Sequence, residues 1–301
     1  MKKILIAVLV LTVCLAGYYT WSVADGYTSG GATVTDAVET IDIRWTSGSV
    51  TVGYHDADTV ILEEEAVRPI EGNDRLRWKL DGKTLVVEYN TPGFLDFLNF
   101  TKPSKALTVT LPKGIALKKA DIIATSADIV VPELTAEEIT LGSTSGDVKA
   151  EVTAPVVYGE STSGDVILKV NGKAENVKAG STSGHLDLTL EEAEKADLGT
   201  TSGGVALEAG TLKEAKIGST SGDIRVRVET FDTLKIGTTS GSVDAELPAE
   251  PGFTAEISTT SGDFNSDLAL FKDGNTWSCG DGSAKLAIST TSGDVKLAVL
   301  K

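Results

Sequence analysis

Apolar and polar positions alternate along short stretches of this chain, and the alternation changes phase at regular intervals. Leu234 and Ile236 alternate with polar residues on the way to Gly241. After this glycine the apolar positions shift by one residue, to Val243 and Ala245. A two-residue period places alternate side chains on opposite faces of an extended strand. The pattern therefore predicts two strands per repeat, joined by a corner at the glycine.

The corner is marked by a recurring triplet, Thr-Ser-Gly. It ends at Gly48, Gly146, Gly164, Gly184, Gly203, Gly222, Gly241, Gly262 and Gly293, and a degenerate copy ends at Ala127. From Ala127 to Gly262 the copies are 19, 18, 20, 19, 19, 19 and 21 residues apart. This period is too short for a strand–helix–strand unit but lets the chain circle once and lie parallel to itself. We therefore predict an all-β, single-stranded parallel β-solenoid (β-helix) with coils of about 19 residues.

Stacked coils lead to specific expectations for the triplet. Each glycine is expected to supply the positive φ of a bulge or sharp corner. The hydroxyl residues at the third and first positions before it, such as Ser143 and Ser145, are expected to point inward. There they would form ladders in which each hydroxyl bonds the same group one coil away. The threonine between them, such as Thr144, should face outward, and the triplet is structural.

The chain divides into three parts along its length. Residues 1–24 form a signal peptide or signal anchor, residues 25–115 an irregular β-rich part and cap, and residues 116–301 the regular coils, continuous with the part before. Within 25–115, strands are expected at Val60–Glu64, Leu76–Leu80, Leu85–Tyr89 and Leu107–Leu111, with a hairpin turn at Asp81-Gly82. Near the C-terminus, Phe271–Gly282 is expected to leave the stack as an excursion before a last coil, Leu286–Leu300.

The N-terminus has the pattern of an export signal. Lys2 and Lys3 precede an apolar run, Ile4–Gly17, and Ser22-Val23-Ala24 offers small residues for cleavage. From Ile4 to Trp21 there are 18 residues, which is enough to span a bilayer if the segment stays uncut. Either way, the rest of the chain is expected on the extracytoplasmic side, secreted or anchored in the membrane by the N-terminal helix.

Charge and cysteine content exclude several classes of partner. The 301 residues carry 27 Lys and Arg against 43 Asp and Glu, a net charge of −16. Such a surface repels nucleic acid and anionic lipid, so we expect no nucleic-acid partner and membrane contact only through the N-terminal segment. The two cysteines, Cys14 and Cys279, cannot form a disulfide framework or a cysteine zinc site. No cofactor is implied.

Three stretches together resemble a known family. They are the Thr-Ser-Gly-Asp-Val repeats, the lead-in Leu107–Gly114, and the closing stretch from Cys279 through Leu286 to Val295. Over residues 40–301 they look like the bacterial putative-adhesin family, domain of unknown function 4097. The resemblance implies an exported or membrane-anchored β-solenoid, and the family has no established catalytic residues to carry over. This sequence departs from the repeat at Ala127, His185, Gly204 and Ser242.

The residue after each repeat glycine forms a column that could bind a cation. Asp128, Asp147 and Asp165 would lie about 5 Å apart in successive coils, where Ca²⁺ could relieve their repulsion. However, the column is interrupted by His185, and the calcium-binding nonapeptide is absent. We expect instead that each Asp bonds its own backbone at the corner, so no metal site is predicted.

Two other activities fit the sequence less well. A carbohydrate-cleaving β-helix needs acids clustered with Lys or Arg in a groove, but Arg225 and Arg227 are the only arginines after Arg77. His55 and His185 stand apart from any nucleophile. Ice binding would need a flat array of two threonine files, whereas one column flanked by glycine is present.

The remaining candidate is a contact patch in an otherwise aromatic-poor chain. Its residues are Phe94, Leu95, Phe97, Leu98 and Phe100. They would cover the open end of the solenoid or contact a partner. We predict a non-enzymatic cell-envelope protein, an adhesin or scaffold that presents a rigid acidic surface to an envelope protein or glycan. The alternative is a carbohydrate-binding or carbohydrate-cleaving β-helix.

Overall fold

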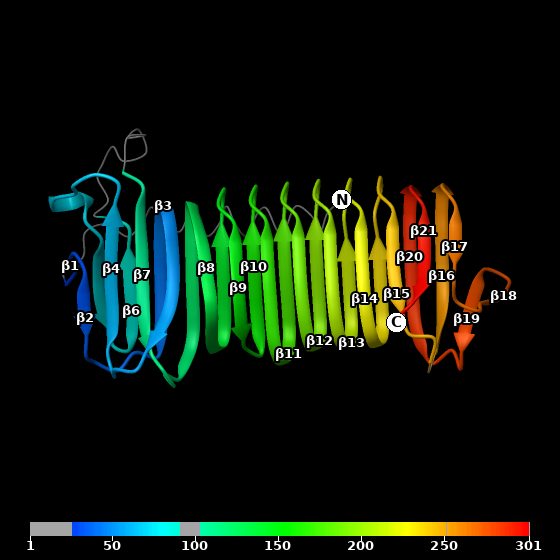
Figure 1. The fold of residues 1–301 in the computed structure, drawn as a ribbon, viewed down its shortest axis with the longest axis horizontal. Helices are drawn as coiled ribbons and strands as arrows, with labels where there is room; N and C mark the ends of the chain where they lie inside the picture. The colour runs from blue at the N-terminus through cyan, green and yellow to red at the C-terminus, as the bar shows by residue number, and fades with distance from the viewer. Residues whose placement is uncertain (1–25, 91–102, 251, 301) are drawn as a thin grey trace.

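The computed structural model describes residues 26–90, 103–250 and 252–300, which form an all-β rod (Figure 1). Its strands make one hydrogen-bonded, 21-stranded system, and the helical content of these residues is one 3-10 turn at Gly72–Asp74. The predicted all-β class is confirmed. In these ranges no helix is long and apolar enough to cross a membrane. The predicted signal or anchor, residues 1–24, lies outside them.

The strands fall into three groups along the rod. The N-terminal group comprises β1 (Thr28–Ser29), β2 (Ala32–Val34), β3 (Thr40–His55), β4 (Val60–Ala66), β5 (Arg77–Asp81), β6 (Thr84–Glu88) and β7 (Lys105–Pro112). The middle group comprises β8 (Leu117–Ser143), β9 (Val148–Thr153), β10 (Val156–Ser161), β11 (Val166–Ser181), β12 (Leu186–Thr200), β13 (Val205–Gly218), β14 (Ile224–Gly237) and β15 (Val243–Leu247). The C-terminal group comprises β16 (Gly252–Ser261), β17 (Phe264–Ser266), β18 (Phe271–Asp273), β19 (Thr276–Gly280), β20 (Ala284–Ser292) and β21 (Val295–Val299).

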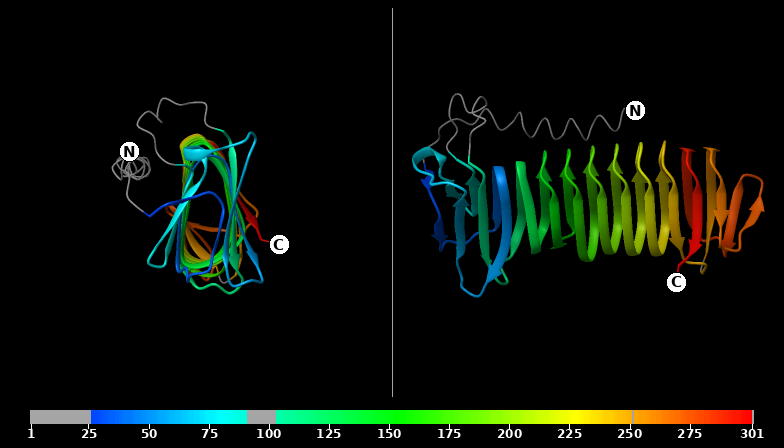
Figure 2. Two further views of the ribbon diagram at one scale, coloured as in Figure 1. Left: turned by 90° about the vertical axis from the view of Figure 1, so that its left-hand side faces the viewer. Right: turned by 45° about the horizontal axis from the view of Figure 1, so that its top comes forward.

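The coils of the middle group stack in parallel. Leu186 of β12 pairs with Val205 of β13, and Val205 pairs in turn with Ile224 of β14. Each strand therefore lies on its equivalent in the preceding coil, so like side chains lie above like. Seen along the rod, the coils superimpose as one flattened loop (Figure 2).

The inward side chains form one continuous core. In β13, Val205, Leu207 and Ala209 are buried and alternate with more exposed residues. Beyond the corner at Gly241 the buried positions are Val243 and those that follow at two-residue steps, which confirms the predicted phase shift. A coil can bury these side chains only against its neighbours, so the stability of the rod comes from nearest-neighbour contacts.

The N-terminal end does not follow sequence order. Strand β3 lies between β8 on one side and β6 and β7 on the other. The coil of β3 therefore lies one coil inside the end, strands β1, β2 and β4 to β7 form the cap outside it, and the chain returns to the inner side of β3 as β8. The predicted hairpin at Asp81-Gly82 is confirmed, because β5 and β6 are antiparallel and Gly82 has φ +59°.

The C-terminal end has a similar exchange. The coil of β20 and β21 lies between that of β14 and β15 and that of β16 and β17. The last coil in sequence is therefore the next to last in space, a departure from simple sequence-order stacking. The predicted excursion contains the β18–β19 hairpin, whose β19 pairs antiparallel with β16.

Candidate functional site

The repeat glycines line up along one edge of the rod, where the backbone of the neighbouring coil leaves no room for a Cβ atom. A Cβ atom on Gly203 would lie 2.0 Å from the carbonyl oxygen of Gly184, and one on Gly222 would lie 1.9 Å from that of Gly203. Among the nine repeat glycines, φ lies in the left-handed range only at Gly48 (+108°) and Gly293 (+156°). The predicted positive φ is therefore wrong for the other seven. Their coils approach too closely for any side chain.

From Gly146 onward, the hydroxyl residue three positions before the repeat glycine ties successive coils together. Oγ of Ser161 donates to the carbonyl oxygen of Gly146 at 3.0 Å and accepts the N–H of Gly164 at 3.0 Å. The bond to the neighbouring coil recurs at Ser143, Ser181, Thr200, Ser219, Thr238, Thr259 and Thr290. This inward ladder is confirmed, but its partner is a backbone carbonyl, not another hydroxyl.

The second predicted ladder is wrong. Ser163, directly before Gly164, is exposed, as are the serines at the same position in the neighbouring coils. The chain bends at the threonine, so the serine side chain faces outward and the serine bonds the neighbouring coil through its backbone N–H. The N–H of Ser163 donates to the carbonyl of Thr144 at 3.0 Å. The outward column of threonines is half-buried to exposed.

The column of acids after the glycines also joins coils. Oδ1 of Asp128 accepts the N–H of Asp147 at 2.9 Å, and Oδ1 of Asp147 accepts the N–H of Asp165 at 2.8 Å. His185 does the same with Nδ1, which accepts the N–H of Gly204 at 2.9 Å. The expected bond to the residue's own backbone is therefore replaced by a bond to the next coil. In the described part of the chain, no group of three or more His, Cys, Asp or Glu could hold a metal ion.

The other candidate reactive groups lie on separate coils. Cys279 is a buried free thiol, and burial raises its pKa. Nε2 of His55 lies 2.5 Å from the carbonyl oxygen of Thr59. Arg227 pairs across coils with glutamates of β13 and β15 at 3.4 and 3.2 Å. These three groups do not form one site.

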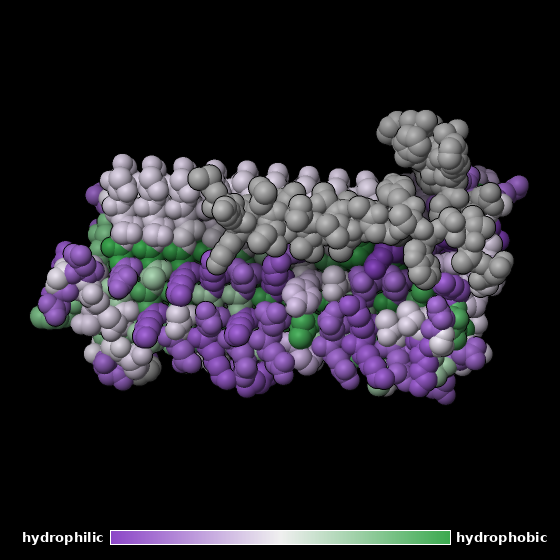
Figure 3. Space-filling view, turned by 180° about the vertical axis from the view of Figure 1, so that it is seen from behind, coloured by the Kyte–Doolittle hydropathy of each residue, from purple (hydrophilic) through white to green (hydrophobic). Residues whose placement is uncertain are grey.

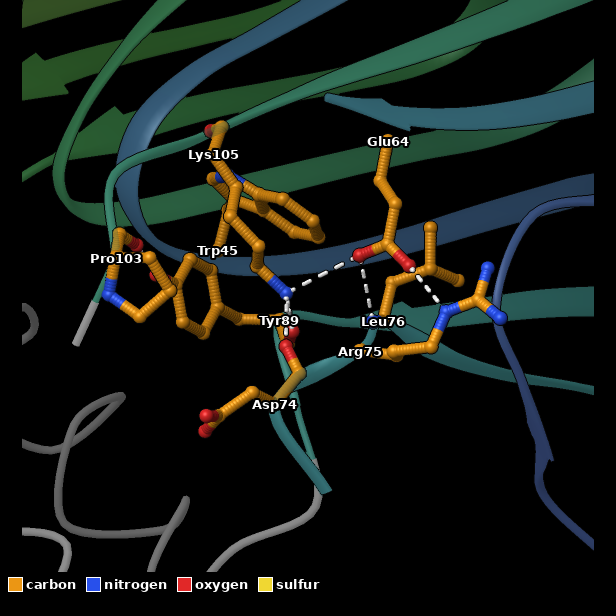
Figure 4. A network of polar contacts seen from close by, with 8 residues as sticks. All are labelled: Trp45, Glu64, Asp74, Arg75, Leu76, Tyr89, Pro103 and Lys105. Atoms are coloured by element: carbon orange, nitrogen blue, oxygen red, sulfur yellow. Dashed lines mark hydrogen bonds and ion pairs between the residues drawn. The ribbon is translucent and has the colours of Figure 1, made fainter. Parts of the chain in front are cut away.

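A buried lysine lies at the N-terminal end of the rod (Figure 4). The side chain of Lys105 is fully buried, and its Nζ donates to the carbonyl oxygens of Asp74, at 2.8 Å, and Tyr89. Nζ also lies 3.3 Å from Oε2 of Glu64, and 5.0 and 4.0 Å from the ring centres of Trp45 and Tyr89. Carboxylate, carbonyls and ring faces together compensate the buried charge. Sequence reasoning missed this cluster, because its members are far apart in the chain and carry no common motif.

The cluster fixes both ends of the segment 91–102. The hydroxyl of Tyr89 donates to the carbonyl of Pro103, while Lys105 holds the carbonyl of Tyr89. Burial raises the pKa of Tyr89 to about 12, so this hydroxyl stays protonated and able to donate. Nε1 of Trp45 donates to the carbonyl of Lys105 at 3.0 Å, from the position that Ser or Thr occupies in other coils. The predicted contact patch, Phe94 to Phe100, lies in this segment and outside the described residues.

A cleft of about 580 Å³ lies beside the cluster and is lined by residues of the paired strands β2 and β4, by Arg75 and by Thr108. Glu64 and Arg75 are its charged lining residues next to Lys105. Oε2 of Glu64 accepts the N–H of Leu76 at 2.8 Å, and Oε1 accepts Nε of Arg75 at 3.3 Å. Both oxygens of this carboxylate are therefore held by protein donors.

The surface differs between the corner and the faces of the rod. The corner forms a pale ridge along one long edge, and hydrophilic residues gather on the lower part of the face below it (Figure 3). Many charges are paired between neighbouring coils, as in Lys169–Glu151 and Lys213–Glu194, both at 2.8 Å. Such exposed pairs add little stability, so the rod depends on its core and backbone ladders.

Comparison with protein families fits this geometry. The model of the Toastrack DUF4097 family matches residues 38–298. The chain belongs to this family. The resemblance predicted from the repeats is thus confirmed, and the Toastrack DUF4097 match spans both exchanged ends as well as the regular coils. No curated protein matches the chain.

Solved structures match the chain at low sequence identity. A putative lipid binding protein from Parabacteroides distasonis matches with TM-score 0.51 and 13% identity over 92% of this chain and 98% of that one. A putative adhesin from Bacteroides fragilis matches with TM-score 0.43 and 14% identity over 91% and 98%. A putative cell adhesion protein from Clostridium sporogenes matches with TM-score 0.20 and 10% identity over 90% and 100%. At these identities the likeness concerns the fold alone.

Proposed function

We propose that this Toastrack DUF4097 protein is a non-enzymatic cell-envelope protein that acts outside the membrane as an adhesin or scaffold. Its partner is an envelope protein or glycan, and it uses no cofactor. Supporting this, the corner hydroxyls, the acids of the column and many charged pairs are all engaged between coils. A rod built in this way is rigid and holds its loops at fixed positions.

The observation that carries the proposal is the buried cluster around Lys105. Burying an ammonium group costs several kcal/mol unless it is paired and hydrogen-bonded. Here the compensating bonds hold together the two ends of the segment 91–102. This segment contains three of the seven phenylalanines of the chain, Phe94, Phe97 and Phe100. We infer that the protein contacts its partner through this aromatic segment, on a fixed base at one end of an acidic rod.

Capture of partners from solubilised cell envelopes tests this proposal. Replacing Phe94, Phe97 and Phe100 together by serine should lower the amount of captured partner at least about tenfold, because a few aromatic anchors dominate most interfaces. Ile167→Ser is the control, since it removes an exposed apolar side chain from the middle of the rod, and its capture should equal that of the wild type. Equal capture by the triple variant would eliminate the segment as a contact patch.

The alternative is a carbohydrate-binding or carbohydrate-cleaving β-helix. It would use the cleft beside Glu64, where a carboxylate and Arg75 line a concave surface. Because both oxygens of Glu64 are held by protein donors, we rank contact ahead of catalysis. Shortening of an acidic polysaccharide incubated with the purified protein would reverse this order.

A further inference from the structure

The outermost coil at the C-terminal end has acceptors of a kind that the corners before it use. From Ala127 to Gly293, each carbonyl along the glycine column receives a hydroxyl from the next coil, and the last of these donors is Thr259, which donates to Gly293. The N–H of Asp263 is likewise held by the carboxylate of Asp294. Beyond Gly262 and Asp263 the structure describes no further coil, so their own acceptors face outward at the end of the rod.

The same coil has a free strand edge. The first half of β16 pairs with β19 on its outer side, but Ile257–Ser261 pairs only with β20, and β17 only with β21, among the described strands. The six residues 257–262 carry no charge and no proline. The N-terminal end differs, because the free edge of β4 there carries Glu63, Glu64 and Glu65. Charges of this kind prevent edge pairing, and the C-terminal edge lacks them.

An exposed aromatic side chain lies on the hairpin that covers the first half of β16. Phe271, on the hairpin β18–β19, is 71% exposed. Trp277 on the same hairpin packs edge-on against Phe264 of β17, with ring centres 5.3 Å apart. The hairpin is therefore anchored to the last coil while Phe271 stays free. A free edge and a neighbouring free aromatic residue are separate features that both favour a protein contact.

We propose that this end pairs with a second copy of the chain. The edges Ile257–Ser261 of two copies would run antiparallel about a twofold axis near Thr259, so that Ser258 of each faces Thr260 of the other. With a net charge of −16, two copies repel each other over most of their surfaces, and an uncharged edge is where they can meet. A ladder of this length makes a weak dimer, at the small end of specific interfaces.

The shape of the end agrees with this arrangement. The hairpin β18–β19 projects beyond the last coil over one half of the end, and the other half is open (Figure 1). A twofold axis brings the hairpin of each copy toward the open half of the other. Phe271 of each copy then packs against its partner, which accounts for an exposed phenylalanine in an aromatic-poor chain.

Sedimentation velocity of the full chain in a non-ionic detergent tests the dimer. The mass should rise toward twice the monomer mass as the concentration approaches about 300 µM, within the range of weak specific association. Ser258→Lys with Thr260→Lys places like charges directly opposite each other and should weaken association at least about tenfold. The matched control is Ser289→Lys with Thr291→Lys, the equivalent residues one coil further in, and it should dimerise like the wild type.

Phe271→Ser is a second test that leaves every coil intact, and it should also weaken the dimer. Circular dichroism melting curves identify any variant that fails to fold. A wild-type chain that stays monomeric at the highest concentration would overturn the proposal. So would a dimer that neither the edge variant nor Phe271→Ser weakens. Association of the open edge with an unrelated protein, and not with itself, would count against the second copy as occupant.

Discussion

At the scale of single residues, the chain contains two kinds of glycine with different roles. Corner glycines such as Gly203 face a backbone carbonyl so closely that no Cβ fits. Gly180, Gly199 and Gly218, each four residues before a corner, leave room for a Cβ, because the nearest atom to an added Cβ on Gly218 would lie at an ordinary contact distance of 3.8 Å. In the sequence both classes are simply repeated glycines. They differ in how closely the backbone of the neighbouring coil approaches them.

Alanine substitution should separate these two classes. Gly203→Ala should lower the free energy of unfolding by more than about 3 kcal/mol, because the new methyl group would collide with the carbonyl of Gly184. Gly218→Ala should raise it by about 0.5 kcal/mol, because alanine loses less backbone entropy on folding. Urea unfolding followed by circular dichroism measures both. Similar losses at the two positions would contradict the steric explanation.

At the scale of elements, the sequence predicts strands and corners well, because each coil repeats its own pattern. The buried alternation and the hydroxyl three residues before the glycine are local features, and the structure has both. Coil order at the ends is not local. Every coil offers nearly the same carbonyl and hydroxyl to a neighbour, so nothing in the repeat specifies that the coil of Gly293 lies on that of Gly241. The Lys105 cluster was missed for a related reason, since its contacts depend on the way the end is closed.

The exchanged order at the C-terminal end gives a testable expectation. Deleting residues 283–301 removes β20 and β21, the coil on which β16 and β17 rest. Amide hydrogens in β16 to β19 should then exchange rapidly, while those of β11 to β13 stay protected. Hydrogen exchange with mass spectrometry measures this. Continued protection of β16 would mean that its coil has moved directly onto the coil of Gly241.

At the scale of the whole molecule, the acid column runs along the rod as a structural ladder and not as a cation site. Its links use a carboxylate oxygen, Nδ1 of His185 or Oγ of Ser242 to hold a backbone N–H of the next coil. The column is interrupted at Gly204, which has no side chain to offer. A cation would have to compete with these bonds along its length.

Calcium should therefore leave the stability of the protein unchanged. We expect melting temperatures in about 5 mM calcium and in excess chelator to agree within about 1 °C. An ion stabilises a protein only if it binds the folded chain more tightly than the unfolded chain, and the acid column is not expected to do so. Asp147→Ala, which removes the bond to the N–H of Asp165, should lower the melting temperature by roughly 2–6 °C in either condition. Thermal unfolding by circular dichroism provides both values, and a clear rise with calcium would point to a bound ion.

The position of the last coil also determines how the rod responds to a pulling force. The strand nearest the C-terminal residue, β21, is hydrogen-bonded on both sides, to β15 and to β17. A load applied at the C-terminal residue must therefore break two ladders together, whereas an outermost coil would peel away one bond at a time. A mechanically resistant tail of this kind suits a protein that is held at one end and pulled at the other.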